Sequence, residues 1–176
     1  YDPQNPATHI VDMSENELEV PEDYTKEERR PDILCYTTAP LPEDVTITGD
    51  MTAELYVSST APDTDFVVRV TDVDETGRSI KLADGVLSAR YRSGFGKADF
   101  LEEGQIACLK IRTTKLSNCF RKGHRIRVTV TSSAENFIFP NSNTREGYNS
   151  TVTVVAENTL HHGGAYASKL IVRVEE

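Results

Sequence analysis

Apolar and polar residues alternate with a period of two along most of the chain from residue 33 onward. Met51, Ala53, Leu55 and Val57, for example, are separated by more polar neighbours. Because successive side chains of a strand point to opposite faces of a sheet, this pattern predicts short strands with one buried face. The segments expected to be strands are 34–36, 45–47, 51–57, 66–73, 86–91, 106–112, 126–131, 151–156 and 170–174.

Turn-forming residues separate these segments. The stretch 74–77 places Gly77 where a tight reversal needs positive φ, and Asp84-Gly85 is a dipeptide typical of two-residue hairpins. Gly104 and Gly123 punctuate two later strands. The sequence contains no amphipathic helical pattern of about 12 residues. The fold class predicted is therefore all-β, an antiparallel sandwich or barrel.

The first 32 residues differ from the rest of the chain. Between Asp12 and Arg30 the chain carries many acidic residues and few apolar ones. We expect residues 1–32 to form an extended, solvated, acidic lead-in with one helical turn around 24–29. Residues 33–176 are expected to form one β-domain.

Composition supports this fold and excludes several classes of protein. Val, Ile and Thr, which favour strands, make up 44 of 176 residues. The net charge of −9 argues against a nucleic-acid partner, and no apolar run reaches the roughly 18 to 20 residues that span a bilayer. The three cysteines, an odd number without a CxxC pair, favour buried or half-buried thiols over a disulfide scaffold. The compartment stays open, with the cytoplasm favoured over secretion.

Hydrolytic and metal chemistry find little support in the sequence. The G-x-S-x-G pentapeptide of α/β-hydrolases is absent from the chain, and the serine pairs 58–59 and 132–133 lie in or beside predicted strands. The adjacent His161 and His162 would point to opposite faces of a strand, which disfavours a shared ion. We expect no catalytic residue and no cofactor.

Four aspartates are the remaining candidates for a cation site. Acidic loops at the rim of a sandwich can bind Ca²⁺, which takes six to eight oxygen ligands. An Asp-x-Asp pair supplies only two or three of these, and an Asp in a turn is already explained by hydrogen bonds to nearby backbone N–H groups. We therefore expect no metal, and the calcium candidates are Asp63, Asp65, Asp72 and Asp74.

Five segments in order resemble one known family. They read LCYTTAPLPEDVTITG, LYVSSTAPDTDFVVRVTDV, LADGVLSARYR, SNCFRKGHRIRVTVTSS and NTLHHGGAYASKLIVRV, at residues 34–49, 55–73, 82–92, 117–133 and 158–174. Together with the opening YDPQNPAT they resemble the C-terminal, non-catalytic domain of the cocaine esterase / Xaa-Pro dipeptidyl-peptidase (CocE/NonD) family of serine hydrolases. The resemblance covers essentially the whole chain.

The resemblance implies a jelly-roll β-sandwich of the galactose-binding-like type, packed against an α/β-hydrolase domain upstream in the same polypeptide. The catalytic triad of such enzymes lies upstream of this domain, and the resemblance does not carry the triad histidine onto His9. It implies a domain that stabilises the catalytic domain, forms a wall of the substrate cleft or builds a homodimer interface. The chain opens on Tyr1 rather than Met, and we expect it to be a piece of a longer protein.

The inter-domain or cleft contacts are expected in two loops, 136–146 and 158–166. The first loop departs from the family's F-P-R-F-x-R-N-x-N-T-G-like stretch, since its arginines and glycine are displaced or absent. An alternative stays open, that of a freestanding carbohydrate- or peptide-binding sandwich, although the chain has no Trp. The candidate contact residues are Asn136, Phe137, Phe139, Asn141, Asn143, His161, His162 and Tyr166.

Overall fold

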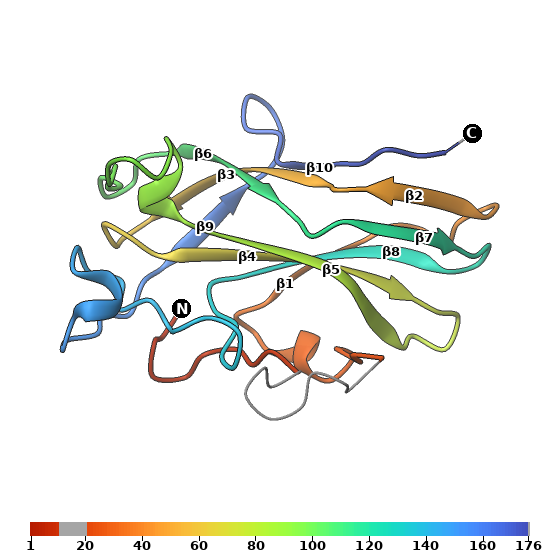
Figure 1. The fold of residues 1–176 in the computed structure, drawn as a ribbon, viewed down its shortest axis with the longest axis horizontal. Coiled ribbons are helices and arrows are strands. Elements are labelled where there is room, and N and C mark those ends of the chain that lie inside the picture. The colour runs from red at the N-terminus through yellow and green to blue at the C-terminus, as the bar shows by residue number, and fades with distance from the viewer. Residues whose placement is uncertain (11–20, 176) are drawn as a thin grey trace.

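The chain forms a two-layered antiparallel β-sandwich, seen in the computed structural model of Figure 1, which describes residues 1–10 and 21–175. Within these ranges no helix is long and apolar enough to cross a membrane. The strands are β1 (Leu34–Thr37), β2 (Val45–Gly49), β3 (Thr52–Ser59), β4 (Asp65–Val73), β5 (Ser79–Ser88), β6 (Ala107–Arg112), β7 (Leu116–Phe120), β8 (Arg125–Thr131), β9 (Asn158–His161) and β10 (Lys169–Ile171). Three 3₁₀ turns complete the elements: η1 (Glu27–Arg29), η2 (Ala89–Tyr91) and η3 (Gly147–Asn149).

The first layer has the strand order β1-β8-β4-β5, with every pair antiparallel. The central strand β4 is buried at nearly every position, so both of its faces are covered. One face, which includes Phe66, Val68 and Val70, packs on the second layer. The other face is covered by the N-terminal segment, as described below.

The second layer consists of strands that bend in the middle. Register pairs Gly49 with Leu116 in β2–β7 and Thr52 with Arg112 in β3–β6, so the ladder slips by one residue where the two halves meet. The chain after β10 borders β2, because Thr48 N–H donates to the carbonyl of Arg173. The β3 half therefore lies between β6 and β9–β10, and the β2 half lies between β7 and the C-terminal residues.

Strict alternation of buried and half-buried residues along β3 explains how the layer faces the core. Ala53, Leu55 and Val57 point inward and are almost fully buried. They belong to a larger apolar cluster that also contains Leu109 and Val130, drawn from the two layers. A smaller cluster around Met51 fills the β2 half of the sandwich. The predicted fold class, an all-β jelly-roll sandwich, is confirmed.

The N-terminal segment packs on the sandwich instead of being solvated. Ala7, His9 and Tyr24 are between 0 and 2% exposed, so the expectation of a solvated lead-in is wrong for these residues. Backbone hydrogen bonds fix the segment, since Tyr24 N–H donates to the carbonyl of Ser79. The predicted helical turn is present as η1. The expectation for residues 11–20 lies outside the described part of the chain, and the domain boundary at residue 33 stays a prediction.

Three of the strand predictions fail in whole or in part. In the segment 170–174 the strand β10 ends at Ile171 and is followed by an isolated bridge between Val174 and Ile47. The segment 151–156 alternates Thr and Val but forms no strand, because it lies at the surface and makes only isolated backbone bonds, such as Val154 N–H to the carbonyl of Ser142. The segment 86–91 is strand only to Ser88 and then turns into η2, whereas β5 begins earlier, at Ser79. Strands β7 and β9 were not predicted, because few apolar residues mark them.

The cysteines differ in exposure. Cys108 and Cys119 are half-buried, as predicted, but Cys35 is exposed because it lies on the edge strand β1. All three are free thiols.

The two glycine-containing turns predicted around β5 have different outcomes. The turn at 74–77 is confirmed, with Gly77 at φ +88° and the Asp74 carboxylate accepting a hydrogen bond from Thr76 N–H. The hairpin predicted at Asp84-Gly85 is wrong, because both residues lie inside β5 and pair with β4. Glycine is required at position 85 because the backbone of Arg112 approaches β5 closely. A Cβ atom there would lie 2.4 Å from the carbonyl oxygen of Arg112. The backbone after β6 therefore closes one side of the sandwich against β5.

This close approach predicts a large cost for Gly85→Ala. The added methyl must displace backbone, so we expect a loss of about 1–3 kcal/mol in the free energy of unfolding. Gly96→Ala is the matched control, because a Cβ atom at Gly96 meets nothing within 4 Å. Urea unfolding of both variants checks the prediction, and equal midpoints for the two would contradict it.

Candidate inter-domain surface

The predicted contact residues lie in two separate places. Residues 136–143 follow β8 and lie beside the N-terminal segment, whereas His161, His162 and Tyr166 belong to the end of β9 and the loop that leads to β10. In Figure 1 the N-terminal segment is at the lower edge of the molecule and the β9–β10 loop is at the upper edge. The two groups therefore cannot contribute to one compact site.

The N-terminal segment and the chain after β8 form one continuous surface. Glu135 makes two backbone hydrogen bonds with the N-terminal segment. Its N–H donates to the carbonyl of Ala7, and its carbonyl accepts from the N–H of His9. The ring of Phe137 stacks on the imidazole of His9 at a centroid distance of 4.8 Å. Phe137 remains 40% exposed, so it covers His9 and still faces outward.

A charged cluster anchors the N-terminal segment from beneath. His9 Nε2 lies 3.3 Å from Asp84 Oδ2, and the Lys81 ammonium lies 2.6 Å from Glu22 Oε1 and 3.4 Å from Asp84 Oδ2. Burial raises the pKa of Asp84, but the hydrogen bond with His9 and the nearby cations outweigh burial and leave that pKa below its ordinary value. The charges of this cluster are paired, as buried charges must be.

Arg69, a buried cation of β4, also contacts the N-terminal segment, through the aromatic ring of Tyr24. Arg69 is 2% exposed, and its guanidinium lies 3.6 Å from the centre of the Tyr24 ring. Nε and Nη2 of Arg69 have no hydrogen-bond partner in the described part of the chain. The Tyr24 ring provides a cation–π contact for this charge, which is worth more when the site is desolvated.

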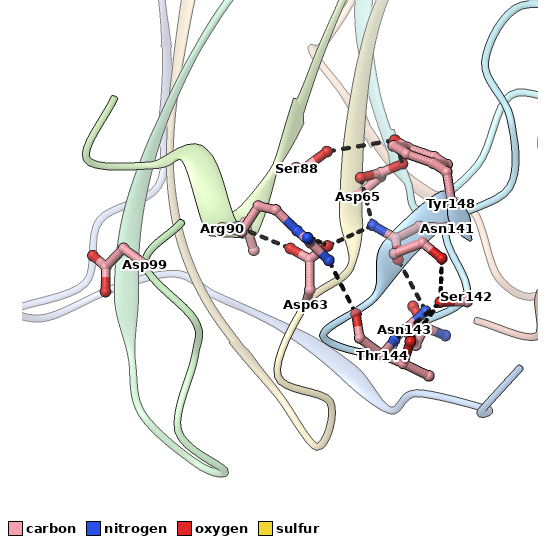
Figure 2. Close-up of polar contacts among 12 residues, drawn as sticks. Asp63, Asp65, Ser88, Arg90, Asp99, Asn141, Ser142, Asn143, Thr144 and Tyr148 are labelled. Carbon is pink, nitrogen blue, oxygen red and sulfur yellow. Dashed lines mark hydrogen bonds and ion pairs between the residues drawn. The ribbon is translucent and has the colours of Figure 1, made fainter. Parts of the chain in front are cut away.

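Two buried aspartates at the start of β4 organise the chain beyond Phe139, as Figure 2 shows. Asp63 is fully buried and binds Arg90 in two ways, through the backbone N–H at 2.9 Å and through Nε at 2.7 Å. The amide of Asn141 donates from Nδ2 to Asp63 at 2.8 Å and to Asp65 at 3.0 Å. Arg90 also donates from Nη2 to the carbonyl of Thr144. One cation and one amide thus tie the loop to both carboxylates.

Asp63 is paired with the Arg90 cation, whereas the charge of Asp65 is balanced only by hydrogen bonds from neutral groups. Burial raises the pKa of Asp65, and the hydrogen bonds from Asn141 and Tyr148 only partly offset that effect. The Tyr148 hydroxyl donates to Asp65 Oδ2 at 2.7 Å. Burial and the Asp65 charge in turn raise the pKa of Tyr148, which keeps its hydroxyl protonated as a donor.

The loop then fixes an exposed apolar segment, residues 151–155. Asn143 adopts φ +62°, a left-handed conformation that Asn tolerates, and its Nδ2 donates to the carbonyl of Val154 at 2.6 Å. Val152, Val154 and Val155 are 62, 46 and 65% exposed. The same segment lies against the N-terminus, because Ala156 N–H donates to the carbonyl of Tyr1.

The predicted contact residues near this surface therefore divide by burial. Asn141 and Asn143 are each 1% exposed, so they support the loop from inside. Phe139 is 82% exposed and Asn136, at φ +75°, lies at the surface. Arg90 and Tyr148 were not among the predicted residues. The motif that contains Arg90 was visible in the sequence, but no local pattern shows that it reaches Asp63.

The second group lies around β9. His161 Nε2 is 2.9 Å from the hydroxyl of Ser58, and the rings of Tyr56 and Tyr166 are 5.6 Å apart. His162 instead lies edge-on to Tyr36, with ring centroids 6.0 Å apart. The adjacent imidazoles thus have different neighbours, as the geometry of a strand requires.

The calcium candidates lie at opposite ends of β4. Asp63 and Asp65 bind Arg90, Asn141 and Tyr148, whereas Asp72 lies 2.9 Å from His124 and Asp74 caps its own turn. Each carboxylate therefore already has protein partners. No group of three or more His, Cys, Asp or Glu side chains gathers as metal ligands would within residues 1–10 and 21–175.

The buried pair predicts a large effect of Arg90→Ala. Removal of the guanidinium leaves the Asp63 carboxylate buried without its cation, so we expect a loss of about 3–5 kcal/mol in the free energy of unfolding. The matched control is Arg112→Ala, which breaks a surface pair with Asp50 and should cost less than about 1 kcal/mol. Urea unfolding compares the two variants, and similar losses in both would show that the Asp63 pair has no special role.

The cluster around Asp84 predicts acid sensitivity. Because the pKa of Asp84 is lowered on folding, its contribution to stability is present above the unfolded value of 3.8 and is lost as the pH falls below it. In Asp84→Asn the free energy of unfolding should therefore fall less steeply between about pH 5 and pH 3 than in the unmodified chain. Denaturant titrations across this range measure the slope, and an unchanged slope would contradict the assignment.

Comparison with known proteins gives consistent matches over the whole chain. The family model described as X-Pro dipeptidyl-peptidase C-terminal non-catalytic domain matches residues 2–171. The cocaine esterase of Rhodococcus sp. (strain MB1 Bresler) is 36% identical over 181 residues, which cover 99% of this chain and 31% of that protein. The chain thus spans about a third of the length of this relative.

Solved structures show the same fold. An aminopeptidase from a marine sediment archaeon, Thaumarchaeota archaeon, superposes with a TM-score of 0.92 at 23% identity, covering 99% of this chain and 32% of that one. An α-amino acid ester hydrolase superposes with a TM-score of 0.84 at 22% identity, covering 99% and 31%. At these identities the likeness concerns the fold alone, and the galactose-binding-like subtype stays a prediction.

Proposed function

Because the chain belongs to the family of X-Pro dipeptidyl-peptidase C-terminal non-catalytic domains, we propose that it is the accessory β-sandwich of a larger CocE/NonD-type serine hydrolase. The family resemblance noted in the five sequence motifs is confirmed. In this proposal the catalytic α/β-hydrolase domain lies upstream in the same polypeptide. The reaction is ester, amide or Xaa-Pro peptide hydrolysis, carried out by residues of that other domain.

The exposed apolar segment 151–155 is the observation that supports a docking role. Its valines are held outward by a loop that is itself fixed by buried hydrogen bonds to Asn143 and Asn141. Large apolar side chains that are both exposed and rigidly presented suit a contact surface, because little conformational entropy is lost on binding. The segment adjoins Tyr1, and the N-terminal segment is where the resemblance places the connection to the catalytic domain.

The same surface suits a second part of the proposal, a wall of the substrate cleft. Phe139 is 82% exposed and lies in the loop between β8 and the segment 151–155. Together with Phe137 and Asn136 it forms the outward part of the predicted contact loop. The homodimer expected from the resemblance remains a separate proposal that this surface does not require.

Charge substitutions at the valines test the docking role. In the longer polypeptide, Val152→Asp with Val155→Asp should separate the thermal unfolding of the β-sandwich from that of the catalytic domain and raise amide hydrogen exchange at 151–156. The reason is that a docked apolar surface cannot accept unpaired carboxylates. In the 176-residue chain alone the same pair of changes should leave the melting temperature nearly unchanged.

Val174→Asp is the matched control, since Val174 is 54% exposed and lies near the C-terminus, far from Tyr1 in Figure 1. It should leave the unfolding of the two domains coupled. Coupled unfolding in the double variant, with exchange at 151–156 as slow as in the parent, would show that the catalytic domain docks elsewhere.

A further inference from the structure

The sandwich is closed along one side and open along the other. On the closed side Thr114 N–H donates to the carbonyl of Asp84 at 2.8 Å, which joins β5 to the chain after β6. On the other side the edge strand β1 of the first layer faces β9 and β10 of the second, with no strand pairing between them in the described residues. The space between the layers is therefore accessible from the side of β1, β9 and β10.

An apolar cavity of about 280 Å³ lies between the layers on this side. An engineered apolar cavity of about 150 Å³ is large enough to bind benzene, so this one has room for a larger ligand. A shallower depression continues from it along Ile126 and Val172. The walls come from both layers, and the aliphatic lining residues are Ala53, Leu55, Val128, Val130, Leu160 and Leu170.

Of the polar residues at the cavity, the side chains of Tyr36 and His162 make no hydrogen bond or ion pair with the described part of the chain. The Ser168 hydroxyl already donates to the carbonyl of His161 and accepts from Tyr56 N–H. The Lys169 ammonium lies 3.3 Å from Glu54, a residue of β3 that alternates with the inward-facing Ala53 and Leu55. Tyr36 and His162 remain, edge-on to each other at a ring distance of 6.0 Å.

The Tyr36 hydroxyl and the His162 imidazole indicate which polar group a ligand would carry at the mouth of the cavity. A tyrosine hydroxyl donates a hydrogen bond, and an imidazole carries at least one N–H in either tautomer. Two donors beside an otherwise apolar hollow suit a group that only accepts, which a carboxylate does. Each methylene placed between the layers should strengthen binding by roughly fourfold, because it removes apolar surface from water.

We infer that the cavity between β1 and β9–β10 binds a small monocarboxylate with an aliphatic or aromatic tail of about six to ten carbons. The tail lies between the layers, and the carboxylate lies at the mouth, beside Tyr36 and His162. This site is separate from the docking surface around Val152 and does not depend on a catalytic domain. It would make the sandwich a sensor or carrier of amphiphilic acids.

Titration with sodium octanoate tests the site in the 176-residue chain. Methyl NMR signals of Val128, Leu160 and Leu170 should shift with saturation. Octan-1-ol, which lacks the carboxylate, should bind about three- to tenfold more weakly, and acetate, which lacks the tail, should cause no saturable shift. Absence of saturation by octanoate up to its solubility limit would overturn the proposal.

Two substitutions separate the cavity from non-specific adsorption. Val128→Phe extends a half-buried side chain of the lining into the hollow, so it should weaken octanoate binding by about tenfold or more while the variant still unfolds cooperatively in urea. Tyr36→Phe with His162→Ala should remove the preference for octanoate over octan-1-ol but keep binding of the alcohol. Val152→Leu, at an exposed site elsewhere, is the control and should bind as the parent does.

Sedimentation during the same titration examines the other possible occupant, a second copy of the chain. The state of association is expected to be the same at every octanoate concentration. If octanoate instead dissociated a dimer, or if Val128→Phe bound octanoate as tightly as the parent, the assignment of the cavity to a small ligand would be wrong.

Discussion

Two carboxylates buried side by side at the start of β4 constrain a large part of this molecule. Asp63 and Asp65 are both fully removed from solvent, and a buried carboxylate is tolerated only with close partners. The partners come from distant points of the chain: Arg90 after β5, and Asn141 and Tyr148 after β8. Satisfying the two charges therefore determines the path of the chain between β8 and β9.

The position of the exposed valines follows from this arrangement. Once Asn141 is held by the aspartates, its Oδ1 accepts from Asn143 N–H, and Asn143 in turn holds the carbonyl of Val154. The N-terminal segment is fixed by equivalent means, with His9 and Glu22 paired to Asp84 and Lys81. The proposed docking surface is thus assembled from remote segments by buried polar contacts, while the apolar core holds the layers beneath it.

The fold could be predicted from the sequence wherever side-chain alternation reports burial. The segment 51–57 became β3 because one layer covers one of its faces, and 126–131 became β8 for the same reason. The alternation at 151–156 predicted a strand that is not formed, because a pattern of Thr and Val does not show whether a neighbouring strand exists. Gly85 was assigned to a turn because the carbonyl of Arg112, which leaves no room for a Cβ atom at this position, is 27 positions away in the sequence. The loop 136–146 could be proposed as a contact loop from its polar and aromatic residues, but the burial of Asn141 depends on Asp63, which no local pattern reveals.

The bend in the second layer has a consequence for cooperativity. It divides the apolar interior into a larger cluster between β3, β6, β4 and β8 and a smaller one around Met51 and Phe120, and Leu170 packs against both. β4 contributes Val68 to one cluster and Val70 to the other, and β8 likewise contributes Val130 and Ile126, so the two halves are joined through the first layer and the Leu170 side chain. Such a partition is the structural basis of sub-global unfolding, in which one half can open while the other keeps its packing. The half that contains Met51 has fewer buried side chains, so thermal fluctuations of the native state should begin at the β2–β7 end of the molecule.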